Sequence, residues 1–248
     1  MTPISAAEVV ATLASLPPGI VATDADGTLW TGDVADDWLA ALEKDAAPLN
    51  AEHLRAVASR LGLPDDPRPG AFVQSARNAY DSGHLDEATF FSLVAITLGH
   101  IEETAARRAI TNSLAAANLP ARLIAETLSV LAGARAHGHR IVVVSASPKW
   151  VVEEALALAR ISVDRVIGLE LTADQIHTRI PRSYGEGKRT LLRAYQGDAA
   201  AHLVHVALGD SGFDAPMLAC AGVALAVRPK ASLVLEAASF SALRLLTA

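Results

Sequence analysis

The stretch from Gly19 to Trp30 reads Gly-Ile-Val-Ala-Thr-Asp-Ala-Asp-Gly-Thr-Leu-Trp, and we expect the rest of the chain to be organised around it. Its first half is apolar and rich in β-branched residues, which favours a strand buried on both faces of a parallel sheet. Asp24 and Asp26 then follow two residues apart, so an extended backbone would point both carboxylates the same way. Gly27 allows the sharp turn that ends the strand. Two converging acids at such a place are costly unless a cation offsets their charge, and Mg²⁺ prefers oxygen ligands of this type.

The pentapeptide Asp24-Ala25-Asp26-Gly27-Thr28 resembles the first motif of the haloacid dehalogenase-like (HAD) superfamily. Most members of this superfamily are phosphatases that act through an aspartyl-phosphate. Taken alone, the motif leaves an Asp-rich surface turn as the alternative. A calcium loop of the EF-hand type fits badly, because the glycine falls at the fourth place rather than the sixth. Three further motifs along the chain decide between these interpretations.

The composition indicates a folded protein with no affinity for polyanions or membranes. The chain has 248 residues, of which 51% are hydrophobic, and its formal net charge is −6. This charge gives no basic surface that would attract nucleic acid or anionic lipid. Cys220 is the only cysteine, so no internal disulfide is expected and a reducing compartment is the natural assumption. Since no signal peptide and no apolar run of about 18 residues is visible, we expect a cytoplasmic protein that neither spans a membrane nor binds nucleic acid.

The periodicity of apolar residues predicts an all-helical block between two parts of an α/β domain. A helix is expected over residues 5–16, before the first strand. Between about residues 34 and 119, helical patterns follow one another without a convincing strand. The apolar stripes are Trp38, Leu39 and Leu42; Leu54, Val57 and Leu61; Phe72, Ala76 and Tyr80; and Phe90, Phe91, Val94 and Leu98, followed by a segment at 101–117. We assign residues 1–33 and 119–248 to the core and 34–118 to an inserted helical cap domain.

After Pro120, strands and helices alternate, which implies a doubly wound parallel sheet of Rossmann-like type with right-handed crossovers. We expect strands at 141–144, 163–171, 203–208, 223–227 and 243–246, and helices at 121–136, 149–159, 191–195, 216–221 and 232–238. Ligands of such folds bind beyond the carboxyl ends of the strands. The remaining motifs all lie at strand ends or helix starts.

Ser145 closes the apolar run at 141–144 and carries the second motif. A small hydroxyl between a strand end and a helix N-terminus is well placed to hydrogen-bond a phosphoryl oxygen, with an ordinary helix N-cap as the alternative. In context, Ser145-Ala146-Ser147-Pro148 resembles the second motif of the phosphoserine-phosphatase-like branch of the superfamily.

Lys188, in Gly185-Glu186-Gly187-Lys188, carries the third motif. An ammonium group at the start of a helix supplies a point charge for a phosphate or an aspartate nucleophile, with a solvated surface lysine as the alternative. A Walker-type P-loop is excluded, because Arg182 stands where it needs glycine and Arg189 where it needs Ser or Thr. The tetrapeptide resembles the third motif of the family.

The fourth motif is Gly209-Asp210-Ser211-Gly212-Phe213-Asp214, directly after the apolar strand at 203–208. Two acids four residues apart at a second strand end can help to hold a cation and its waters, with a structural turn as the alternative. Four motifs in the right order, each at a strand end or helix start, carry the resemblance to the superfamily over the core on both sides of the helical block.

The resemblance implies a phosphoric monoester hydrolase. Asp24 would attack phosphorus and form the aspartyl-phosphate, and Asp26 would protonate the leaving oxygen and later deprotonate water. Ser145 and Lys188 would stabilise the charge on the phosphoryl oxygens. Because halide release needs no proton, dehalogenases of the superfamily lack the second acid, so its presence here argues for phosphate.

The implied cofactor is Mg²⁺, which neutralises charge between nucleophile and phosphoryl group. The metal residues would be Asp24, Asp26 through its backbone carbonyl, and Asp210 as a direct ligand. Asp214 would serve an outer role towards a metal-bound water or Lys188.

The leaving group is less constrained by the sequence. Thr28 and Ala146 are assigned to substrate binding with their motifs. Asp33 stands where phosphoserine phosphatases place the acid that contacts the substrate amino group, and Arg77, on a cap helix, is a candidate for a substrate carboxylate. Phe213 departs from the asparagine common in phosphoserine phosphatases, which leaves other small phosphomonoesters open.

The expected function is therefore Mg²⁺-dependent hydrolysis of a small phosphorylated metabolite. Three alternatives stay open: transfer of the phosphoryl group to an acceptor alcohol, a non-hydrolytic phosphoacceptor that signals, and a phosphate-binding protein without catalysis. The cap would close over the phosphate and exclude water. A homodimer is left open as an oligomeric state.

Overall fold

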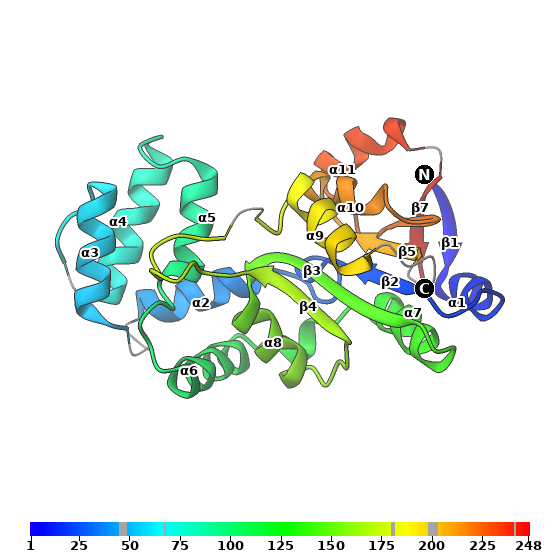
Figure 1. Ribbon diagram of the computed structural model, residues 1–248, viewed down its shortest axis with the longest axis horizontal. Coiled ribbons are helices and arrows are strands. Elements are labelled where there is room, and N and C mark those ends of the chain that lie inside the picture. The colour runs from blue at the N-terminus through cyan, green and yellow to red at the C-terminus, as the bar shows by residue number, and fades with distance from the viewer. Residues whose placement is uncertain (45–48, 67, 180–181, 198–202, 241) are drawn as a thin grey trace.

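The computed structural model describes residues 1–44, 49–66, 68–179, 182–197, 203–240 and 242–248. Its core is a seven-stranded parallel sheet in the order β1-β7-β6-β5-β2-β3-β4 (Figure 1). The strands are β1 (Thr2–Ser5), β2 (Ile20–Thr23), β3 (Arg140–Pro148), β4 (Arg165–Leu169), β5 (Val204–Gly209), β6 (Val223–Ala226) and β7 (Leu243–Thr247). Every residue of β2 is buried, as expected for a central strand covered on both faces. The fold class predicted from the sequence is confirmed.

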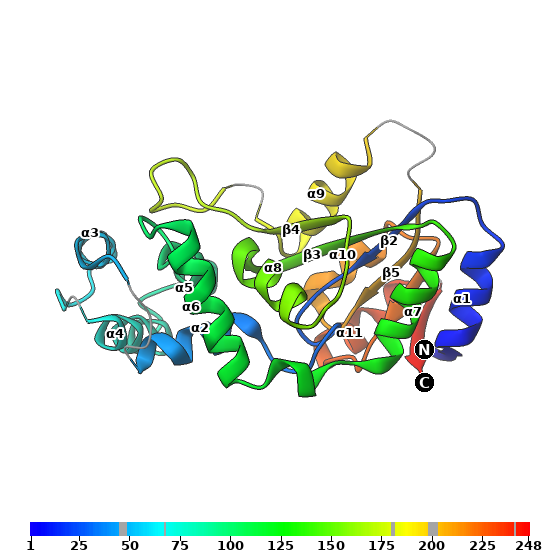
Figure 2. The same ribbon diagram turned by 90° about the horizontal axis from the view of Figure 1, so that it is seen from below.

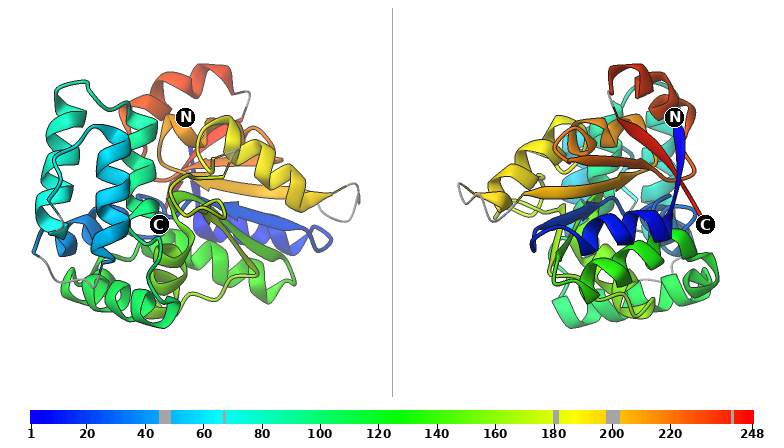
Figure 3. Two further views of the ribbon diagram at one scale, coloured as in Figure 1. Left: turned by 60° about the vertical axis from the view of Figure 1, so that its left-hand side comes forward. Right: turned by 90° about the vertical axis from the view of Figure 1, so that its right-hand side faces the viewer.

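Helices cover both faces of the sheet. The core helices are α1 (Ala6–Ala14), α7 (Ala125–Ala136), α8 (Lys149–Leu158), α9 (Glu186–Gln196), α10 (Ala215–Leu218) and α11 (Ala231–Glu236). Helices α1, α7 and α8 share one apolar cluster with one face of the sheet, and α9, α10 and α11 share a second cluster with the other (Figure 3). The chain goes from β2 to β3 and β4 on one side and returns to β5, β6 and β7 on the other. The carboxyl end of β2 is thus the switch point at which such sheets bind ligands.

In the part of the block that the structure describes, the predicted helical region contains five helices, all between β2 and α7 in the chain. They are α2 (Val34–Glu43), α3 (Ala51–Leu61), α4 (Pro69–Asp81), α5 (Glu87–Ile96) and α6 (Glu103–Ala116). Figures 1 and 2 show α3 and α4 farthest from the sheet, while α6 packs on α8 and α5 contacts β3. Trp38 is fully buried in the block and donates from Nε1 to Thr97 Oγ1 at 3.1 Å. The division into core and cap domains stays a prediction, and we refer to α2–α6 as the cap.

Several element boundaries differ from the sequence predictions. Strand β1, which pairs with β7, was not predicted because it is only four residues long and contains Pro3. The helix expected over 121–136 is a 3₁₀ turn, Leu119–Arg122, followed by α7. Helix α9 begins at Glu186 rather than near 191, which places Lys188 in its first turn. The predicted stripes of the cap are buried or half-buried except for Phe91, which is 44% exposed. In the described ranges, no helix is long and apolar enough to cross a bilayer.

Candidate active site

Asp24 follows β2 directly and is held in the sheet by its backbone, because its N–H donates to Leu208 O of β5 at 2.9 Å. The side chain is buried. Three residues later Gly27 has a φ of +79°, and a Cβ at this position would lie 2.0 Å from Asp210 Oδ2. Only glycine satisfies both the left-handed backbone and the close approach of the carboxylate. The Asp24–Gly27 turn therefore brings the ends of β2 and β5 into contact.

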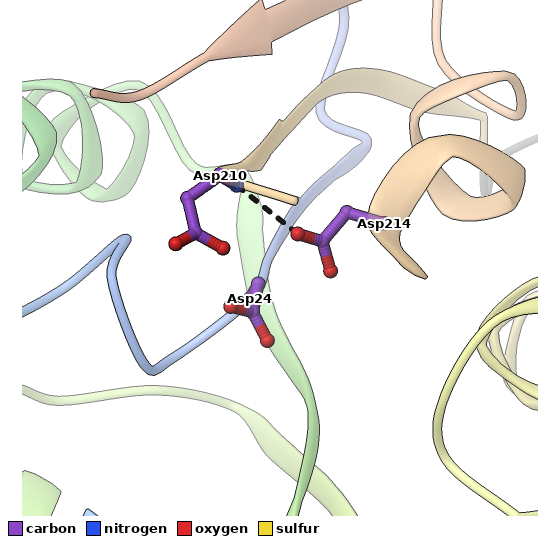
Figure 4. A group of neighbouring side chains, drawn as sticks. All are labelled: Asp24, Asp210 and Asp214. Carbon is purple, nitrogen blue, oxygen red and sulfur yellow. Dashed lines mark hydrogen bonds between the residues drawn. The ribbon is translucent and has the colours of Figure 1, made fainter. Parts of the chain in front are cut away.

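The ends of three neighbouring strands meet at one cavity of about 230 Å³. Asp24 lies after β2, Ser145 lies within β3 and Asp210 lies after β5, and all three line the cavity together with Lys188 of α9. Figure 4 shows the carboxylates of Asp24, Asp210 and Asp214 turned towards one another. Because the carboxyl ends of parallel strands share one edge of the sheet, the fold itself produces this convergence.

Lys188 connects two of these carboxylates. Its Nζ is buried and donates to Asp24 Oδ1 and to Asp214 Oδ1, each at 2.6 Å. The other oxygen of Asp214 accepts from the backbone N–H of Asp210 at 3.0 Å and of Ser211 at 2.9 Å. Because both of its oxygens accept hydrogen bonds from the protein, Asp214 is suited to positioning Lys188. Its outer role towards a metal-bound water stays a prediction.

The electrostatics of this group leave negative charge uncompensated. Burial, and then the charge of Asp214, raises the pKa of Asp24 well above its usual range despite the nearby ammonium. Burial alone would lower the pKa of Lys188, but the charges of Asp214 and Asp24 outweigh it and raise that pKa. Burial would likewise raise the pKa of Asp214, but the charge of Lys188 lowers it. Two buried carboxylates share one ammonium here, so a further cation would stabilise the site.

A metal ion fits the residues present. Ligand oxygens of Asp24, Asp210 and Asp214 lie within 4.8 Å of one another, and all three residues are buried. Burial also raises the pKa of Asp210, whose Oδ2 lies 3.0 Å from Lys230 Nζ. Hard cations such as Mg²⁺ take carboxylate oxygens of this kind, and with Asp214 engaged by Lys188, Asp24 and Asp210 are the candidate direct ligands.

Asp26 has a different environment from Asp24. Its Oδ1 accepts from Trp30 Nε1 at 2.8 Å and from the Val34 N–H at 2.9 Å, while its Oδ2 accepts from Ser147 Oγ at 2.6 Å. Burial raises its pKa, although the hydrogen bonds of Ser147 and Trp30 act in the opposite direction. The side chain does not belong to the group of Asp24, Asp210 and Asp214, which we call the three-carboxylate group. The contribution of the Asp26 backbone carbonyl to a metal site stays a prediction.

Ser145 and Ala146 line the cavity near the carboxyl end of β3, shortly before α8 begins. Ser145 is buried, and its Oγ accepts from the Ser147 N–H at 3.0 Å. Its own O–H has no acceptor among the residues that the structure describes, so it is free to donate into the cavity. Thr28 is also buried, and its Oγ1 donates to Asp24 Oδ2 at 3.4 Å; the structure therefore places it behind the carboxylate.

The inserted helices and the residue that precedes them supply another part of the cavity wall. Asp33, the N-cap of α2, accepts from the backbone N–H groups of Ala35 and Asp36. Burial, followed by the charges of Asp26 and Asp36, raises the pKa of Asp33 to about 7. The exposed ring of Phe91 on α5 also lines the cavity, which explains why this residue departs from the buried stripe.

The structure does not bring Arg77 to the cavity. Its Nη2 lies 3.2 Å from Glu43 Oε1, and its guanidinium lies 6.0 Å from the centre of the Phe90 ring. Two other cations, Arg182 and Lys230, line the cavity instead. Neither residue was predicted as a site residue from the sequence. The one available signal was position along the chain: Arg182 comes shortly before Lys188, and Lys230 comes shortly after the end of β6.

Comparisons with known proteins agree with this geometry. A family model described as haloacid dehalogenase-like hydrolase matches residues 21–219. No curated protein matches the sequence. Among solved structures, a protein of unknown function from Bordetella pertussis Tohama I is similar at 17% identity and a TM-score of 0.69, with 94% of this chain and 99% of that one covered.

Phosphoserine phosphatases are also among the similar structures. A substrate-bound phosphoserine phosphatase complex has 13% identity and a TM-score of 0.55, with 93% and 94% of the two chains covered. A probable phosphoserine phosphatase from Vibrio cholerae has 19% identity and a TM-score of 0.55, with 91% of this chain and 59% of that chain covered. At these identities the similarity establishes a shared fold.

Proposed function

The chain belongs to the haloacid dehalogenase-like hydrolase family, and from this premise we propose that it is a Mg²⁺-dependent phosphomonoesterase for a small metabolite. The observation that carries the proposal is the contrast between two acids on one turn. Asp24 lies at the three-carboxylate group beside Lys188, whereas Asp26 is fixed by three donors and has a raised pKa. Two carboxyl groups with different environments are the usual basis for dividing nucleophile and acid roles.

Asp24 is the proposed nucleophile. One of its oxygens attacks phosphorus in line, so that a carboxylate–phosphorus bond forms as the bond from phosphorus to the leaving oxygen breaks. The hydrogen bonds from Lys188 and Thr28 hold the carboxylate in one orientation at the cavity wall. This positioning reduces the entropy cost of reaching the attacking geometry.

Asp26 is the proposed general acid and base. A raised pKa keeps a proton on a carboxyl group more readily near neutral pH, and this proton passes to the departing alkoxide. The resulting carboxylate then accepts a proton from the water that attacks the aspartyl-phosphate, which releases inorganic phosphate and restores both acids. The three donors around Asp26 prevent its rotation away from the cavity.

Charge on the phosphoryl oxygens is stabilised by the ammonium of Lys188 and the free O–H of Ser145, both of which line the cavity. Asp24 and Asp210 would hold Mg²⁺, and the ion supplies positive charge that the two carboxylates and the phosphoryl group together require. The cavity of about 230 Å³ is smaller than the pockets of roughly 300–1,000 Å³ typical of drug-sized ligands, so a small substrate is favoured.

Phosphate release from a panel of small phosphomonoesters tests the proposal, with and without Mg²⁺. We expect Mg²⁺-dependent turnover that Asp24→Asn abolishes. Asp65→Asn is the matched control. The Asp65 side chain is exposed and lies between α3 and α4, outside the motifs that carry the candidate site residues. If no ester releases phosphate although the protein is folded, hydrolysis is ruled out. Product esters formed when acceptor alcohols are added would instead indicate a phosphotransferase.

A further inference from the structure

Among the residues that the structure describes, Arg182 is the cation of the cavity without an acidic partner. Of the described residues lining the cavity, Lys188, Lys230 and Arg182 are cationic. Lys188 is paired with two carboxylates and Lys230 with one. Within the described ranges, Arg182 forms no ion pair, and its one hydrogen bond is from Nε to Thr178 Oγ1 at 3.2 Å. Both Nη groups are therefore available to a ligand.

The position of Arg182 is fixed by the surrounding structure. Thr178 is buried, pairs with Leu171 in an antiparallel bridge, and has its hydroxyl 3.4 Å from Ser92 Oγ on α5. On the backbone side, a Cβ at Gly187 would lie 1.6 Å from the carbonyl oxygen of Arg182. The glycine before Lys188 thus allows Arg182 to pack directly against the first turn of α9.

No carboxylate among the described residues forms an ion pair with the guanidinium of Arg182, although Asp86 feels its charge. Asp86, the N-cap of α5, has its pKa lowered mainly by its hydrogen bonds to Thr89 and to a small degree by Arg182. Its carboxylate accepts from the Thr89 N–H at 2.6 Å. An arginine that lines a partly enclosed cavity without a carboxylate partner lacks the interaction that normally offsets its desolvation.

The lining of the cavity also includes aromatic rings. Phe91 and Phe213 are 44% and 49% exposed, and both line the cavity with Tyr184, whose ring meets that of Phe213 edge-on at 6.0 Å. Exposed aromatic rings and an arginine without an acidic partner in one cavity are typical of a site that takes a ligand with a short apolar body and a polar end. The phosphoryl group would occupy the other end, near Asp24.

We propose that Arg182 binds an anionic oxygen group on the alcohol portion of the substrate, so that the preferred phosphomonoesters are those of short hydroxy acids. This inference rests on the proposed phosphatase function and gives it a substrate class. The two Nη groups match the two oxygens of a carboxylate, and the small cavity favours this planar group over a second phosphoryl group. The role expected for Arg77 thus falls to a residue of the core, and Arg182 is a specificity residue.

Binding of two non-hydrolysable probes tests the inference. 3-Phosphonopropionate and propylphosphonate have the same chain and differ by a carboxylate in place of a methyl group. Isothermal titration calorimetry with Mg²⁺ would give both dissociation constants for the unaltered protein, for Arg182→Gln and for Arg179→Gln. Arg179 is a matched control, because it lies in the same segment but is 65% exposed and paired with Glu170.

We expect the unaltered protein to bind 3-phosphonopropionate about 10- to 100-fold more tightly than propylphosphonate, as charge-assisted hydrogen bonds allow. Arg182→Gln should remove this preference while its affinity for propylphosphonate stays within about twofold, and Arg179→Gln should retain the preference. Unchanged binding of propylphosphonate shows that the variant is folded. Thr178→Val, which removes the Nε acceptor, should weaken the preference partially.

Equal affinities in the unaltered protein, or a preference that survives Arg182→Gln, would overturn the inference. Hydrolysis is measured separately, as phosphate release from 2-phosphoglycolate, a phosphomonoester of a short hydroxy acid, and from ethyl phosphate, which has a methyl group in place of the carboxylate. A carboxylate preference that depends on Arg182 in a protein that hydrolyses no ester would support the role of the arginine and refute the phosphatase. The two proposals can therefore fail independently.

Discussion

Replacing Asp26 by Asn should remove proton transfer while preserving the local structure. The amide oxygen of Asn can still accept from Trp30 Nε1 and the Val34 N–H, and the amide NH₂ would face Ser147 Oγ, which can accept as well as donate. All three contacts of Asp26 are therefore retained. What is lost is the proton for the leaving oxygen, and general acid catalysis is worth about 10²–10⁴ in rate.

The effect should depend on the leaving group. Ethoxide needs the proton, whereas p-nitrophenolate leaves readily without it. For Asp26→Asn we expect kcat/KM to fall by about 10²–10⁴ with ethyl phosphate and by less than about tenfold with p-nitrophenyl phosphate. Because the same group deprotonates the water in the second step, the variant should also accumulate aspartyl-phosphate. A stopped-flow trace should then show a burst of p-nitrophenolate equal to the protein concentration.

The control is Asp65→Asn, which should leave kcat/KM for both esters and the pre-steady-state trace as they are in the unaltered protein. An equal fall in kcat/KM for the two esters would refute the assignment of Asp26, since a loss that ignores the leaving group is a loss of binding or of structure. The absence of a burst with a slow steady state would refute its role as the base of the second step.

Three further predictions concern stability and metal binding. Gly27→Ala should lower the free energy of unfolding by well over about 1 kcal/mol, and by more than Gly83→Ala, which has a similar φ of +73° but no atom within 4 Å of its Cβ; equal losses in urea unfolding would contradict the proposed clash with Asp210. The pKa of Asp33 is raised from 3.8 to about 7, so the folded state binds the proton more tightly and the free energy of unfolding should fall as pH rises from about 4 to 7. Asp33→Asn keeps an N-cap and should flatten this slope in urea titrations; a slope unchanged by the substitution would place its origin elsewhere. Mg²⁺ should raise the Tm of the protein by binding the folded state, and Asp210→Asn should abolish the rise; a rise that persists in calorimetry would exclude this ligand set.

The convergence of three candidate site residues on one cavity could be predicted from the sequence, because all three lie at strand ends. Asp24, Ser145 and Asp210 each terminate or follow an apolar run, and a parallel sheet necessarily gathers such ends at one edge. Lys188 was assigned to the start of a helix, and the structure shows it in the first turn of α9. The family resemblance was confirmed because its four motifs are local in sequence. The parallel sheet was confirmed because strands buried on both faces leave short, continuous apolar runs between helical segments.

Other features could not be read from local patterns. Strand β1 is short and contains Pro3, and it exists only because β7, more than 200 residues later, offers it a partner. Helical periodicity placed Phe91 in a buried stripe, but the neighbouring cavity leaves part of its ring exposed. Whether Arg77 or Arg182 reaches the cavity depends on how the cap and the segment after β4 pack together, and periodicity carries no information on such packing.

The most direct test of the account is to identify the residue that carries the phosphoryl group. Asp26→Asn would be quenched with acid during turnover of p-nitrophenyl phosphate, and its peptides would be analysed by mass spectrometry. We predict a phosphoryl group on Asp24 and none on the doubly substituted chain that also carries Asp24→Asn. Phosphate on Ser145 or Ser147, or phosphate release with an unmodified Asp24 throughout, would contradict the account.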